Sequence, residues 1–188
     1  MRIVLFFSTI LILSSAANAS VVTLDFENLA EGSTEGSSVT EDGFTVATDA
    51  IYFIAVNDGS NQTLNLLSGN SYFISENNGQ SFDLLSLDTQ EWHVGGYDGS
   101  NPTRIIGNYA AGGQIEMTLP VPGSLAGLDT ANFNAAWSGL SSLEIQAGGN
   151  NGFYLDNAVM SVVPVPAAAW LFGSALAGLG WIRRKQVT

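Results

Sequence analysis

The sequence predicts an all-β protein, an antiparallel β-sandwich of the jelly-roll kind, with an N-terminal signal peptide and a C-terminal transmembrane helix. Three observations support this prediction. The 188-residue chain carries a long apolar stretch at each end. Between these stretches, short apolar or alternating runs recur about every ten residues and are set apart by Gly, Asn, Asp and Ser. No helical period of any length interrupts those runs.

The N-terminal segment, residues 1–19, has the organisation of a secretory signal peptide. Arg2 gives it a positive start, an apolar run follows, and Ala17 and Ala19 place small side chains where signal peptidase requires them. We expect cleavage before Ser20, after which the mature chain has left the cytoplasm. An uncleaved membrane anchor is the alternative, but the apolar run is short for a span and the cleavage site is well formed.

The body, residues 20–162, contains the expected strands. Turn dipeptides such as Asp58-Gly59 and Asn78-Gly79 separate them, and the polar Gly/Ser-rich segment 31–38 is expected to be a long loop. Short strands at this spacing are typical of a β-sandwich. The runs expected to form strands are 21–26, 43–47, 51–56, 63–67, 71–75, 81–87, 91–97, 114–119, 131–137, 143–147 and 153–163.

The charge of the body excludes several classes of function. All 17 Asp and Glu residues lie there against a single cation, Arg104, which leaves a formal net charge of −16. Such a surface repels phosphate backbones, so nucleic-acid binding is excluded. The chain has no cysteine and only one histidine, His93, and no nucleophile motif is present. We therefore expect no enzyme, with a carboxylate pair of a glycoside-active enzyme as a minor alternative.

The C-terminal segment, residues 163–188, has three parts. Prolines alternate in 163–166, the sixteen residues 167–182 carry no charge, and the basic triplet 183–185 follows at once. A helix of that length measures roughly 24 Å, slightly less than the hydrocarbon core of a bilayer. Cations that follow an apolar helix are retained in the cytoplasm, so the body lies outside. A buried core helix is the alternative.

This tail resembles the sorting signal of PEP-CTERM proteins in its VPLPA-type form. The residues that carry the resemblance are Val163, Pro164, Val165, Pro166, Arg183, Arg184 and Lys185. It implies that the chain is the substrate of an exosortase in the inner membrane of a Gram-negative bacterium that makes exopolysaccharide. The two prolines are then recognition residues, and the body is periplasmic before it reaches the cell surface or the extracellular matrix.

Acidic residues near the two ends of the body form a second pattern. Asp25 and Glu27 alternate on the first strand, and Asp156 and Asn157 lie on the last. These segments resemble jelly-roll carbohydrate-binding modules of the galactose-binding-like kind. The resemblance implies a structural calcium ion held by Glu27 and Asp156, with Asp25 and Asn157 as helpers. Oxygen donors suit calcium, and the alternative is that these carboxylates are simply solvated.

Sugar binding requires aromatic faces beside polar side chains. Trp92, Tyr97 and Trp137 are the candidates, and core packing is the alternative for each of them. We therefore expect an exported, sorted, non-enzymatic protein of the cell envelope or matrix that associates with exopolysaccharide and binds glycan. A purely structural surface protein cross-linked by calcium is the alternative.

Overall fold

The computed structural model describes residues 19–27, 32–34, 38–49, 53–57, 62–66, 69–93, 102–119, 128–148 and 151–162. All of these residues belong to one compact unit that spans Ala19–Val163. The predicted sorting tail and the predicted signal peptide up to residue 18 lie outside them. Within the described ranges, no helix is long and apolar enough to cross a membrane.

Every strand pair in the described body is antiparallel, which confirms the predicted all-β antiparallel class. The strands are β1 Ser20–Leu24, β2 Gly32–Thr34, β3 Ser38–Glu41, β4 Phe44–Thr48, β5 Phe53–Asn57, β6 Gln62–Leu66, β7 Ser71–Glu76, β8 Phe82–His93, β9 Arg104–Tyr109, β10 Gln114–Thr118, β11 Asp129–Asn132, β12 Leu140–Gln146 and β13 Asn151–Val162. A short 3₁₀ helix, η1 Ala135–Trp137, lies between β11 and β12.

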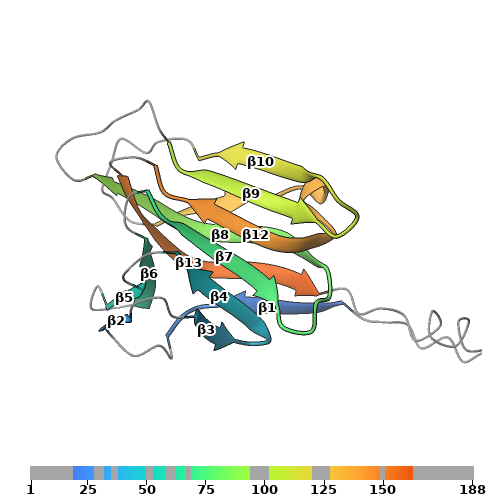
Figure 1. The fold of residues 1–188 in the computed structure, drawn as a ribbon, viewed down its shortest axis with the longest axis horizontal. Helices are drawn as coiled ribbons and strands as arrows, with labels where there is room; N and C mark the ends of the chain where they lie inside the picture. The colour runs from blue at the N-terminus through green and yellow to red at the C-terminus, as the bar shows by residue number, and fades with distance from the viewer. Residues whose placement is uncertain are drawn as a thin grey trace, which may run out of the picture. The chain divides into compact units, whose positions relative to one another are not determined.

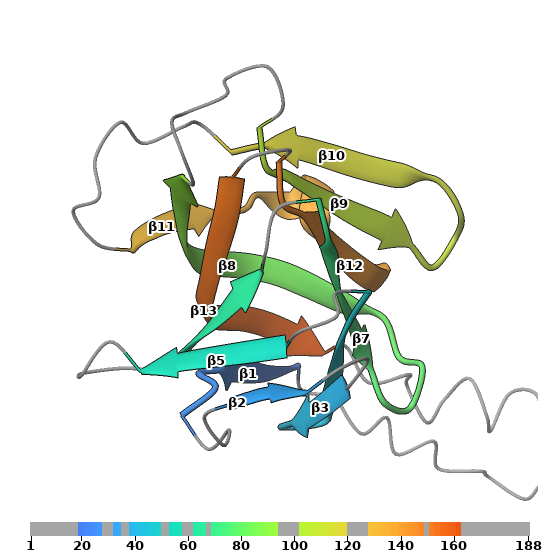
Figure 2. The same ribbon diagram turned by 60° about the vertical axis from the view of Figure 1, so that its left-hand side comes forward.

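The strands form two groups that enclose one core (Figures 1 and 2). In the first group β13 pairs with β8, β6 and β1, and β11 adds to the far side of β8. The second group has the order β10-β9-β12-β7-β4-β3. The groups join where Leu140 of β12 pairs with Phe82 of β8, so the hydrogen-bonded sheet is continuous.

Alternation along the strands builds the core. In β7, Tyr72 and Ile74 are fully buried whereas Phe73 between them is exposed, because successive side chains of a strand point to opposite faces. Phe44 of β4 meets Phe82 of β8 edge to face, with ring centroids 5.3 Å apart. Large side chains of both groups thus interlock in one cluster.

Several expected element boundaries are wrong. The runs 81–87 and 91–97 share one strand, β8, because the polar residues between them pair with β13 on one side and β11 on the other. The segment 31–38, expected to be a loop, contains β2 and the first residue of β3. The run 131–137 ends β11 and then forms η1, and β9 was not expected at all. Pairing with other strands determined the bounds of β2, β8 and β9.

Candidate functional site

The second strand group turns one face away from the core. Its backbone register aligns Glu116, Ile106, Glu144, Phe73 and Ala47 in one row across β10, β9, β12, β7 and β4. Glu116 and Phe73 are exposed, and Ile106 is buried without belonging to the core cluster. We call this row and the adjoining side chains of the same face, Ser71, Ser75, Arg104 and Gln146, the polar face.

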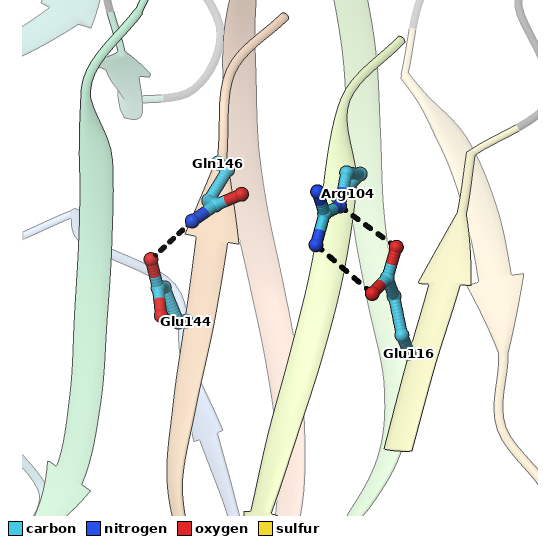
Figure 3. Close-up of polar contacts among 4 residues, drawn as sticks. All are labelled: Arg104, Glu116, Glu144 and Gln146. Carbon is cyan, nitrogen blue, oxygen red and sulfur yellow. Dashed lines mark hydrogen bonds and ion pairs between the residues drawn. The ribbon is translucent and has the colours of Figure 1, made fainter. Parts of the chain in front are cut away.

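Two sets of polar contacts order this face (Figure 3). Nη2 of Arg104 donates to Oε2 of Glu116 at 2.9 Å, and Nε lies 2.7 Å from Oε1 as the second contact of the ion pair. Oε1 of Glu144 accepts from Nε2 of Gln146 at 2.6 Å and from Oγ of Ser71 at 3.4 Å. The Glu116 carboxylate thus neutralises the charge of Arg104. The carboxylate of Glu144, in contrast, accepts hydrogen bonds from neutral donors alone among the described residues.

Phe73 lies near the middle of the polar face, and most of its neighbours on this face have small side chains. It is 40% exposed. Its neighbours on this face are small on three sides: Ser71 and Ser75 along β7, and Ala47 across from it on β4. The apolar ring is therefore accessible and surrounded by hydrogen-bonding groups. A pyranose has an apolar C–H face rimmed by hydroxyls, and it can stack on such a ring while its hydroxyls reach the polar neighbours.

Of the three predicted glycan-contacting aromatics, Trp137 alone has its side chain in the described part of the chain. Trp137 is only 4% exposed and packs edge to face on Phe133 at a centroid distance of 4.8 Å, so its assignment to glycan binding is wrong and it belongs to the core. The backbone of Trp92 lies in β8, but its side chain is outside the described part, as is all of Tyr97. Phe73 was missed because residues 72–74 are all apolar, and the sequence does not show which of them turns away from the core.

The four predicted calcium ligands come together at an interruption of the sheet. β6 pairs with β13 as far as Leu155, and β1 pairs with it from Ala158 onward. Asp156 and Asn157 lie between these two stretches, where the register shifts and the backbone of Asn157 has φ of 43°. The chain that leaves β1 brings Asp25 and Glu27 close enough to influence the charge of Asp156. We call these residues, with Glu41 and Asp88, the acidic cluster.

Hydrogen bonds hold most of the acidic cluster in place. Asp88 accepts from Oγ1 of Thr130 at 2.6 Å and from Nδ2 of Asn157 at 3.0 Å. Oε1 of Glu27 accepts from the backbone N of Gln62 at 3.1 Å. Asp156 is completely buried: its Oδ1 accepts from the N of Asn157 at 2.7 Å, but its Oδ2 has no partner among the described residues. The side-chain oxygen of Gln62 is likewise buried without a partner.

Burial and mutual repulsion change the acidity of this cluster. Burial and, to a smaller extent, the nearby carboxylates of Asp88, Glu27 and Asp25 together raise the pKa of Asp156 to about 6, against the lowering effect of the Asn157 N–H. Burial also raises the pKa of Glu41 to about 7, although the N–H of Phe26, 3.2 Å from its Oε2, lowers it. Part of the cluster therefore takes up protons near neutral pH.

The donors of the acidic cluster have the chemistry that calcium prefers, since they are carboxylate and amide oxygens. The unpartnered Oδ2 of Asp156 and the unpartnered oxygen of Gln62 are the atoms that a cation would satisfy. Nevertheless, no three acidic or histidine side chains of the described ranges are arranged as a metal site. An ion here would need amide or main-chain oxygens as well, and the calcium site stays a prediction.

The raised pKa values predict how stability depends on pH. A carboxyl group that binds its proton more tightly in the folded state destabilises the fold at high pH, and this cost disappears as pH falls through its folded pKa. With divalent cations removed by a chelator, the free energy of unfolding should therefore increase as the pH is lowered from about 8 to about 5. Asp156→Asn should be more stable than wild type at the upper pH and have a flatter profile, measured by urea unfolding. The control is Asp129→Asn, which removes one negative charge from an exposed position and should keep the wild-type dependence of the free energy of unfolding on pH. If Asp156→Asn shows the same pH dependence as wild type, the prediction is contradicted.

Comparisons with known proteins give structural neighbours only. No protein-family model and no curated protein sequence matches the chain. Among solved structures, a variant of a family 29 carbohydrate-binding module is 13% identical, with 77% of this chain and 86% of that chain covered at a TM-score of 0.49. Another variant of that module, solved with cellulohexaose, is 12% identical, with 78% and 93% covered at a TM-score of 0.49. A tandem of family 22 modules from Xyn10C of Paenibacillus barcinonensis is 14% identical, with 81% and 48% covered at a TM-score of 0.41.

Proposed function

We propose that the protein is an exported, non-enzymatic protein of the cell envelope or matrix whose β-sheet body binds glycans on the polar face. The observation that supports this proposal is the accessible ring of Phe73 among polar side chains on one sheet face. Arg104, Glu116, Glu144 and Gln146 supply fixed hydrogen-bonding groups beside it. A flat, open face suits one segment of a long polymer better than a small molecule, which would need an enclosed pocket.

Phe73→Ala should weaken binding of the purified full-length protein to polysaccharide by about tenfold or more, since a tenfold loss corresponds to about 1.4 kcal/mol of lost stacking. Mannan and cellulose oligosaccharides are suitable first probes because carbohydrate-binding modules have been solved with mannohexaose and cellulohexaose. Affinity electrophoresis or calorimetry would measure the change.

Leu85→Ala is the matched control for this test. Leu85 is 38% exposed, nearly the same as Phe73, but it lies on β8 in the other strand group. Its replacement should leave affinity unchanged. If both variants bind as wild type does, or lose affinity equally, the polar face is not the glycan site.

We further propose a second role, in which calcium stabilises the body at the acidic cluster; linking of copies in a matrix would instead use exposed carboxylates, because Asp156 is buried. The buried, unpartnered Oδ2 of Asp156 favours this second role. Glu27 and Asp156 would hold the ion, with Asp25 and Asn157 beside them. The bound cation would relieve the repulsion among carboxylates that raises the pKa of Asp156.

Calcium should raise the Tm of the full-length protein. For a Kd of about 10⁻³ M, about 10 mM calcium stabilises by about 1.4 kcal/mol, or roughly 4 °C for a domain of this size. Asp156→Asn should abolish the rise, and Asp129→Asn should keep it. An unchanged wild-type Tm would exclude the site. Self-association that needs calcium but no sugar would favour the structural role over glycan binding.

Export and sorting complete the proposal, with signal peptidase and an exosortase as the processing partners. Neutral residues in place of Arg183, Arg184 and Lys185 should impair membrane retention and sorting, because the cations stop transfer of the apolar segment. Cell fractionation would measure this. Arg183→Lys with Arg184→Lys keeps the charges and should behave as wild type. Unchanged localisation of the neutral variant would contradict the role of the tail.

A further inference from the structure

We propose that the polar face prefers glycans with free amino groups, such as polymers of glucosamine, over neutral and acidic glycans. This inference rests on the proposed glycan site and names the class of sugar that the site selects. The carboxylate of Glu144 lies beside the accessible ring of Phe73, and the face offers no unpaired cation in the part of the chain that the structure describes.

Glu144 is placed to read a substituent of a stacked sugar. It lies directly opposite Phe73 in the β12–β7 pair, where Cβ atoms are about 5 Å apart, roughly the width of a pyranose ring. The hydrogen bonds that Glu144 receives from described residues, from Gln146 and Ser71, both end on Oε1. Its Oε2 therefore remains for a donor on the ligand, and the Gln146 amide keeps the carboxylate oriented toward it.

The pairing of Arg104 determines which charges the face accepts. Arg104 is the only Lys or Arg between residues 20 and 162, and Glu116 holds it through an ion pair that includes one hydrogen bond. A sugar acid would have to break that pair or lie against the carboxylate of Glu144. A protonated amine instead forms a charge-assisted hydrogen bond with Glu144, which is stronger than a bond between neutral groups.

The body as a whole also attracts cations, because its formal net charge is −16. A general attraction and a specific site make different predictions for single substitutions. Removal of any one surface carboxylate weakens a general attraction to a similar extent. Only removal of Glu144 abolishes a preference that depends on the neighbour of Phe73.

The test compares three hexasaccharides on the full-length protein at about pH 6 and low salt: glucosamine, N-acetylglucosamine and galacturonate. Wild type should bind the glucosamine hexamer about tenfold more tightly than the acetylated one, a difference of about 1.4 kcal/mol, and should bind galacturonate least. Glu144→Gln should bring the first two affinities within about twofold, which is about 0.4 kcal/mol. Asp129→Asn, with the same change in net charge, should keep the tenfold preference.

Each contrary outcome has a separate meaning. Equal wild-type affinities for the acetylated and free-amine hexamers would overturn the amine preference and leave the glycan site intact. Equal effects of Glu144→Gln and Asp129→Asn would overturn the role of Glu144 and attribute the preference to net charge. If no hexamer binds, and Phe73→Ala matches wild type on every polysaccharide tested, the proposed function fails together with this inference.

Discussion

The ladder between β8 and β13 is the constraint on which the rest of the structure depends. Both strands have 12 residues, and they pair from Asn151 with His93 to Val162 with Phe82. The shorter strands β1, β6 and β11 take their positions from this ladder. Strand β12 meets it at Phe82, so the second strand group is also placed through it.

The irregular part of that ladder contains two of the residues of the acidic cluster, Asp156 and Asn157. The bulge at Asp156 and Asn157 interrupts the edge of β13 where β6 stops and β1 has not yet begun. Carboxylates from β8, β13 and the segment that follows β1 lie near one another there, and one of them, Asp156, is fully buried with an unpartnered oxygen. Concentrated like charge of this kind reduces stability unless a proton or a cation compensates for it. The fold thus places several of its carboxylates near the point where its first and last strands pair.

The scarcity of cations links the acidic cluster to the polar face. With Arg104 already paired to Glu116, nothing in the polar face offsets the carboxylate of Glu144. The same composition that repels nucleic acids would also repel acidic polysaccharides at this surface. A neutral or amine-bearing polymer meets no such barrier. The excess of acidic residues therefore restricts which polysaccharides can bind, independently of any individual contact.

Local pattern in the sequence was enough to determine the all-β class and to mark the acidic residues near the two ends of the body. Alternation and turn residues act between neighbours, so they can be recognised without knowledge of the fold. The resemblance to carbohydrate-binding modules also named Asp25, Glu27, Asp156 and Asn157 as a group, and the structure brings them together. It could not name Glu41 or Asp88, which join the cluster from β3 and β8.

Only the tertiary structure decided which side of each strand faces the core. The side chains of residues 71–75 point to alternate faces of β7, but the local sequence does not determine which face is buried. The packing of Tyr72 and Ile74 in the core turns Phe73 outward. The same packing buries Trp137, which its sequence context did not distinguish from a surface aromatic. Period-two alternation is a property of the local backbone, whereas the choice of face depends on long-range pairing, which the sequence does not show directly.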